Sequence, residues 1–306
     1  MLAADAVFED DMILPFQVGE TAIRGRVVRL GGAIDEILSR HPFPDPVREI
    51  LGEAAVLVAM MGSSLKFDGR MIFQARGDGP VSMMVADYEA DGSLRATASV
   101  AHAIGAASRF DALVGSGHFA VTVDQGVDME RYQGVAPIEG ETLAEAAVAY
   151  FNQSEQIPTA IRLAVGRISR PGEGERWRAG GVIAQFVPGE GGDRERGEAV
   201  IKGLDDEEAW ARAAAFLETA QPDELLDPAL SPHQMLYRLF HEDGVRVFDP
   251  SKVTARCSCN SDRIQSVLVR YSPEELVDMV EDGAIRVTCE FCRKLYKFNT
   301  DGSLQA

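Results

Sequence analysis

The first 190 residues contain several short segments in which apolar and polar positions alternate, a pattern typical of half-buried β-strands. We expect strands at residues 21–30, 71–76, 81–86, 94–100, 118–124 and 160–165. The turn Gly77-Asp-Gly-Pro80 separates the second and third of these, which predicts a β-hairpin. Gly115-Ser-Gly117 resembles part of a dinucleotide-binding loop, but the alternating residues 118–123 predict a strand where such a site needs a helix.

Helical periodicity appears between these strands. It predicts a short helix at residues 33–40, a longer one at about 46–63 and another at 142–154. The second is apolar over most of its surface after Glu53, so we expect it to be buried rather than to cross a membrane. Residues 1–190 are therefore predicted to form an α+β core domain, an antiparallel sheet with helices.

A change of composition near Pro188 predicts the end of that domain. Residues 189–196 are rich in glycine and charge. Two amphipathic segments follow, one from Leu204 to about Ala220 and one at Pro232–His241. Residues 191–250 are thus predicted to form a metastable helical linker. Its apolar stripes are either ordinary core packing or a detachable cover that lies on the apolar face of the N-terminal sheet.

The last segment, residues 251–300, is predicted to be a small separate module. Residues 254–259 are expected to be extended, and residues 264–270 alternate like a strand. Ser272-Pro-Glu-Glu275 is a capping box that begins a helix, which Gly283 is expected to close before a strand at 284–288. These elements supply few core residues, so the module needs further support to stay folded.

All four cysteines lie in this module, in two close pairs. They are Cys257, Cys259, Cys289 and Cys292, with 29 residues between the pairs. Two such pairs suit a tetrahedral site of four thiolates, so the pattern predicts one Zn²⁺ per chain. Each pair is also spaced for thiol chemistry. The neighbouring basic residues either favour the thiolates or merely balance the charge of the site; they are Arg256, Arg286, Arg293, Lys294 and Lys297.

Composition narrows the function further. The chain has 306 residues, 46% of them apolar, and a formal net charge of −18. This charge argues against nucleic acid as a partner, because phosphate binding needs clustered lysine and arginine. We expect no membrane association and no enzyme activity, since no catalytic triad or P-loop pattern is present. The acidic N-terminus does not resemble a signal peptide, and metal-type cysteine spacing suggests a reducing compartment, so the cytoplasm is expected.

The cysteine pattern, together with several runs in the N-terminal region, resembles the 33 kDa chaperonin family, also called heat shock protein 33. The matching runs are Leu51-Gly-Glu-Ala, Leu65-Lys-Phe-Asp-Gly69, Gly77-Asp-Gly-Pro80 and Tyr150-Phe-Asn-Gln-Ser-Glu-Gln-Ile-Pro158. The resemblance implies a redox-regulated holdase whose reduced, zinc-bound form is inactive. Oxidation would form the disulfides Cys257–Cys259 and Cys289–Cys292, release zinc and expose apolar surface for unfolding client proteins. It also implies a homodimer in the oxidised state.

Three alternatives use the same cysteines. A zinc ribbon that binds nucleic acid is disfavoured, because residues 251–300 carry eight basic and seven acidic side chains. A thiol oxidoreductase would use Cys289 and Cys292. A static zinc fold would mediate a protein contact and keep its zinc under peroxide. The redox switch is the preferred hypothesis.

Overall fold

The computed structural model describes residues 10–64, 69–125, 129, 131–170, 172, 174–187 and 205–305. The chain divides into two compact units, residues 1–255 and 256–306, which we describe separately. Mixed helix and sheet confirm the predicted α+β class. The predicted boundary near residue 190, and the Leu65–Asp68 part of one family-like run, lie outside the described residues. The division into three functional parts stays a prediction.

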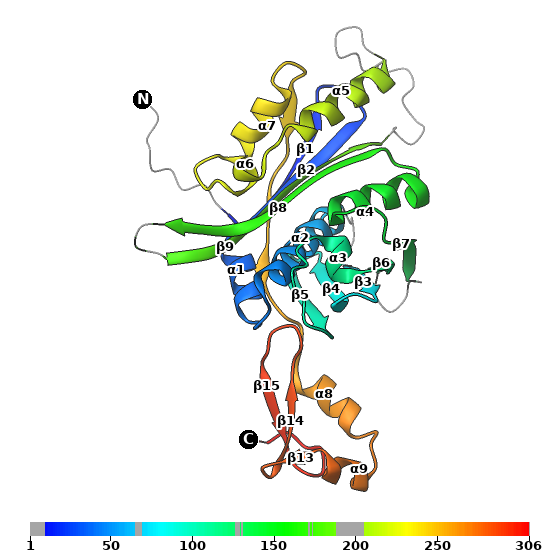
Figure 1. The fold of residues 1–306 in the computed structure, drawn as a ribbon, viewed down its shortest axis with the longest axis vertical. Coiled ribbons are helices and arrows are strands. Elements are labelled where there is room, and N and C mark those ends of the chain that lie inside the picture. The colour runs from blue at the N-terminus through cyan, green and yellow to red at the C-terminus, as the bar shows by residue number, and fades with distance from the viewer. Residues whose placement is uncertain are drawn as a thin grey trace. The chain divides into compact units, whose positions relative to one another are not determined.

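The first unit contains two antiparallel sheets (Figure 1). One sheet has the order β10-β1-β2-β9-β8, and β11 also pairs with β1. Its strands are β1 (Met12–Val18), β2 (Ile23–Leu30), β8 (Thr159–Arg170), β9 (Gly174–Phe186), β10 (Val245–Val247) and β11 (Ser251–Lys252). We call it the first sheet.

The second sheet has the order β12-β5-β4-β3-β6-β7 and is antiparallel except for the short parallel pair β12–β5. Its strands are β3 (Arg70–Gly77), β4 (Val81–Glu89), β5 (Ser93–Val100), β6 (Gly117–Asp124), β7 (Tyr132–Pro137) and β12 (Thr254–Ala255). The predicted hairpin is confirmed by the pairing of β3 with β4. The interpretation of Gly115-Ser-Gly117 is also confirmed, because a strand, not a helix, begins at Gly117.

Helix α2 (Asp45–Gly62) forms the centre of the main core, and every residue from Leu51 to Gly62 except Glu53 is buried. Both sheets contact it. Other helices of this unit are α1 (Gly32–Ser39), α3 (Phe110–Val114) and α4 (Leu143–Tyr150), which continues into a π-helical turn at Phe151–Glu155. Within the described ranges, no helix is long and apolar enough to cross a membrane.

The predicted linker helices pack on the other face of the first sheet (Figure 1). They are α5 (Asp206–Glu218), α6 (Pro222–Leu226) and α7 (Pro232–Phe240). Leu217, Leu236 and Phe240 are fully buried there, and the Phe240 ring stacks on Phe16 of β1 with centroids 5.7 Å apart. The amphipathic stripes thus pack on the apolar face of this sheet, and the choice between ordinary core packing and a detachable cover stays a prediction.

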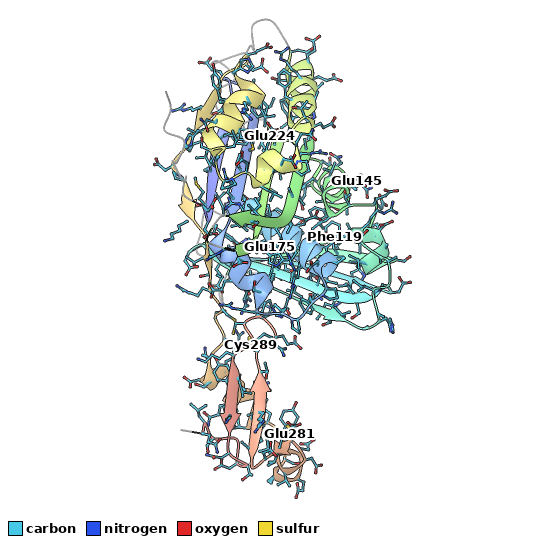
Figure 2. The ribbon with its side chains drawn as sticks, turned by 60° about the vertical axis from the view of Figure 1, so that its left-hand side comes forward. Phe119, Glu145, Glu175, Glu224, Glu281 and Cys289 are labelled. Carbon is cyan, nitrogen blue, oxygen red and sulfur yellow. The ribbon has the colours of Figure 1, made fainter. Side chains whose placement is uncertain are left out.

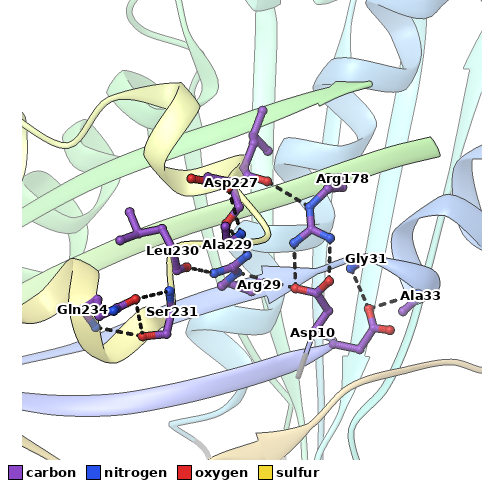
Figure 3. A network of polar contacts seen from close by, with 12 residues as sticks. Asp10, Arg29, Gly31, Ala33, Arg178, Asp227, Ala229, Leu230, Ser231 and Gln234 are labelled. Carbon is purple, nitrogen blue, oxygen red and sulfur yellow. Dashed lines mark hydrogen bonds and ion pairs between the residues drawn. The ribbon is translucent and has the colours of Figure 1, made fainter. Parts of the chain in front are cut away.

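Two arginines of the first sheet also hold the segment that joins α6 to α7 (Figure 3). Arg178 donates from Nε to the carbonyl of Leu226 at 2.9 Å and makes two hydrogen bonds to Asp10. Arg29 donates to the carbonyls of Asp227 and Leu230. The three carbonyls lie between the last residue of α6 and the start of α7, where backbone acceptors lack intrahelical partners, so the arginines satisfy them.

The second unit has a three-stranded sheet and two helices. Its elements are α8 (Ser261–Leu268), α9 (Pro273–Asp278), β13 (Val280–Glu281), β14 (Ala284–Thr288) and β15 (Leu295–Phe298). The buried core is small and consists of Leu268, Leu276, Ile285, Tyr296 and Phe298.

Two expectations for this unit were wrong. Residues 264–270 fall largely in helix α8 rather than in a strand, because Asn260 caps the helix by accepting from the Arg263 N–H at 2.8 Å. The helix that begins after Ser272 has the predicted capping box but ends at Asp278. Gly283 instead lies at the β13–β14 turn with φ of 81°, a conformation that glycine adopts without strain.

Candidate metal centre

The four cysteines lie in two short segments of the second unit, one before α8 and one between β14 and β15. Cys257 and Cys259 directly precede the capped start of α8. The other pair lies in the turn between β14 and β15, where the Cys289 N–H donates to the Lys294 carbonyl and the Arg293 N–H donates to the Cys289 carbonyl, both at 2.9 Å. Arg293 has φ of 59°, which reverses the chain so that both sulfurs of this pair can face one point.

The structure brings the four predicted cysteines together. Their Sγ atoms all lie within 4.8 Å of one another. The Sγ atoms of Cys257 and Cys289 are 3.8 Å apart, and those of Cys259 and Cys292 are 3.4 Å apart. Four ligands at about 2.3 Å around tetrahedral zinc are separated by about 3.8 Å, whereas a disulfide would bring two sulfurs to about 2.05 Å. The arrangement of four free thiols therefore fits a metal ion.

Tyr296 is a further residue of the site that the sequence pattern did not indicate. Its hydroxyl lies 3.2 Å from the Sγ of Cys259 and donates to the Cys259 carbonyl at 3.2 Å. Burial opposes ionisation of Cys259, but hydrogen bonds from Tyr296 and from the other thiols outweigh it and lower its pKa to about 7. Burial raises the pKa of Cys292 to about 12. The hydrogen bond between the Cys259 and Cys292 sulfurs therefore favours ionisation of one of the two thiols and opposes ionisation of the other.

The basic residues near the cysteines are not the cause of the lowered pKa of Cys259. Arg286 makes an ion pair with Asp282 at 3.1 Å, and the Lys294 ammonium lies 4.9 Å from the centre of the Tyr296 ring. The lowered pKa of Cys259 has hydrogen bonding, not these side chains, as its cause. Figure 2 labels Cys289 at one end of the second unit's sheet and Glu281 near the other.

Comparison with known protein families matches residues 11–299 to the family described as Hsp33 protein. The chain belongs to the Hsp33 family. The 33 kDa chaperonin of Caulobacter vibrioides is 48% identical over 314 aligned positions, which cover 99% of each chain. The 33 kDa chaperonin of Serratia proteamaculans is 33% identical and covers 91% of this chain and 88% of its own length.

The fold also matches a solved structure. The 33 kDa chaperonin of Thermotoga maritima superposes with a TM-score of 0.76 over 95% of this chain and 96% of its own, at 23% identity. This likeness shows the fold, and the family membership supports a chaperone function. The family predicted from the cysteine pairs and the N-terminal runs is thereby confirmed.

Proposed function

We propose that this Hsp33-family protein is a redox-regulated holdase, with its switch at Cys257, Cys259, Cys289 and Cys292. In the proposed inactive form these thiolates hold one Zn²⁺. The observation that carries the proposal is a cluster of four sulfurs within 4.8 Å, in a unit whose buried core has five residues. So small a core gains little from apolar burial, which makes metal binding the main support of the fold.

Bound zinc would supply cross-linking of the two cysteine-bearing turns. In small peptides, binding of structural zinc is worth about 10–16 kcal/mol, as much as the whole stability of a typical domain. Loss of the four thiolates should therefore unfold the second unit.

The proposed oxidation uses a peroxide. In each cysteine pair, one thiolate attacks the peroxide to give a sulfenic acid and hydroxide, and the second thiolate displaces water after protonation to form the S–S bond. Formation of each disulfide thus transfers two electrons from the two thiolates to one hydrogen peroxide. With two protons, the peroxide becomes two water molecules. We propose the pairs Cys257–Cys259 and Cys289–Cys292, which together remove all four ligands.

The proposed client surface is the face of the first sheet that α5–α7 cover. It carries eight buried apolar side chains of the linker-facing cluster; they are Leu14, Phe16, Val18, Ile23, Val27, Ala164, Val182 and Ala184. Release of the helices would expose these side chains and the apolar stripes of the helices themselves, a patch well suited to hold unfolding proteins. The proposed partners are therefore unfolding client proteins. We also propose that the oxidised protein pairs with a second copy of the chain, and that it works in the cytoplasm.

One titration tests the proposal. Reduced protein would be exposed to a peroxide series at mildly raised temperature, and each sample assayed for free thiols, zinc content and suppression of aggregation of a heat-unfolded client. We expect one zinc per chain at the start, and loss of four thiols together with zinc as activity rises. A reduced protein without stoichiometric zinc, or equal holding activity before and after oxidation, would refute the switch.

A further inference from the structure

Three arginines lie together on the first sheet, on the face opposite the linker helices. In β2, Ile23 and Val27 face those helices, so Arg24 and Arg26 point to the other side. The same alternation in β10 places Arg246 there. Gln17 of β1 stands between Arg24 and Arg246 and is paired in register with both. We call Arg24, Arg26, Arg246 and Gln17 the arginine face.

None of the three arginines makes an ion pair with any described residue, in a chain with a net charge of −18. Arg246 stacks on the ring of Phe248 at 5.5 Å. Arg26 is half-buried, and its Nε is fully enclosed without a hydrogen-bond partner in the described parts of the chain. Burial lowers the pKa of the Arg26 guanidinium; Tyr88 opposes this effect and the charge of Arg24 adds to it. The Arg26 Nε is therefore an unused hydrogen-bond donor on this face, suited to an oxyanion acceptor.

Arg26 lines two hollows. The first, of about 340 Å³, lies over the arginine face and is also lined by Pro15 and Phe248. The second, of about 200 Å³, has mainly apolar walls; among its lining residues are Met60, Met61, Met71, Val121 and Phe151. Glu155 also lines it, and its carboxylate accepts hydrogen bonds from the Tyr132 and Tyr150 hydroxyls. A basic hollow and an apolar hollow that share one arginine match a ligand with an anionic head and an apolar body.

We propose that the arginine face binds an amphipathic oxyanion. Its phosphate or carboxylate head lies against Arg26, with Arg24 and Arg246 at its flanks, because guanidinium donors match oxyanions in geometry and charge. Its aliphatic or aromatic body occupies the apolar hollow. The site lies wholly in the first unit.

Reduced full-length protein would be titrated with octyl phosphate below its micelle concentration, and in parallel with octanol and inorganic phosphate. Calorimetry would give affinities, and backbone amide shifts in NMR spectra would locate binding. We expect octyl phosphate to bind one site at least ten times more tightly than the other two probes, with shifts concentrated in β2 and β10. Equal affinity for octanol or for inorganic phosphate would overturn the amphipathic assignment.

Substitutions test whether octyl phosphate binds at the arginine face or is attracted non-specifically to any exposed arginine. Arg26→Met should weaken octyl phosphate binding at least about tenfold, because a charge-assisted hydrogen bond is lost. Arg24→Met and Arg246→Met, at exposed positions, should weaken it about two- to fivefold. Arg76→Met, an exposed arginine of β3, is the control and should change nothing. Unchanged binding by Arg26→Met, or an equal loss in Arg76→Met, would refute the site.

A thermal measurement guards against misfolding. Arg26→Met removes a half-buried, unpaired charge, so its melting temperature should equal or exceed that of the unsubstituted protein. Octyl phosphate should raise the melting temperature of the unsubstituted protein but not that of Arg26→Met. A variant that melts lower and still responds to octyl phosphate would contradict the proposed role of Arg26.

Discussion

Phe240→Ala should release the linker helices while the cysteines stay reduced. The Phe240 side chain is completely buried between α7 and the first sheet and stacks on Phe16. Truncation of a buried phenylalanine costs about 3–5 kcal/mol, and loss of the aromatic pair adds about 0.5–1.5 kcal/mol. Two of the three buried residues of α5 are the small Ala209 and Ala213, which contribute little apolar area beside Leu217. Most of the cost should therefore appear as local detachment of α7 and its neighbours.

Hydrogen exchange and client aggregation measure this release. We expect amides of α5–α7 to lose protection in reduced Phe240→Ala, while α2 and β3 keep theirs, and the variant to suppress client aggregation without peroxide. Phe73→Ala is the matched control: Phe73 is equally buried, but in the main core, where it packs on Phe119. It should destabilise the core without uncovering the linker face. Detached helices without holding activity, or equal activity in Phe73→Ala, would refute the proposed client surface.

Three further predictions concern the cysteine site and the core. Cys292→Ser removes one of the four sulfurs, so the purified variant should contain little zinc and show no cooperative folding of residues 256–306; full zinc occupancy would argue against four-sulfur ligation. Tyr296→Phe removes the hydroxyl that lies 3.2 Å from the Cys259 sulfur and should weaken zinc binding, because contacts to a metal ligand hold it in place; competition with a zinc chelator measures this, and an unchanged zinc affinity would contradict the assignment. Burial, with a smaller contribution from Glu49, raises the pKa of Glu53 to about 7. Between pH 4.5 and 7 the folded state therefore keeps a proton that the unfolded state has released. The free energy of unfolding should fall as pH rises through this window. Glu53→Gln should accordingly be stabilised by at most about 3 kcal/mol at pH 8 and by much less at pH 5, as measured by urea unfolding; an equal effect at both pH values would contradict this account.

Much of the fold was predictable from local patterns. Helix α2, the β3–β4 hairpin and the capped linker helices follow from periodicity and turn residues that agree with the final packing. Helix α8 was missed because Ile264, Val267 and Leu268 were interpreted as alternating, although their spacing also fits one helical face behind the Asn260 cap.

Other features depend on contacts between distant segments. Strand β9 was not predicted, since Gly180 and Gly181 weaken a strand pattern. The structure explains Gly180: a Cβ there would lie 2.4 Å from the carbonyl oxygen of Leu225, so glycine allows α6 to approach the sheet. The four cysteines were found from spacing alone, whereas Tyr296 and the arginines that hold the α6–α7 segment join residues far apart in sequence and carry no local signal.

The short strands that lead to the cysteines have a consequence for client capture. Counting back from Cys257, the chain is attached by two residue pairs in β12, two in β11 and three in β10. Such brief attachments can peel away one after another. Their departure would turn β1 and β5 into open sheet margins with unsatisfied backbone donors and acceptors, which accept an extended polypeptide of any sequence as an added strand. A protein whose linker has detached would thus bind clients through main-chain hydrogen bonds as well as through apolar side chains.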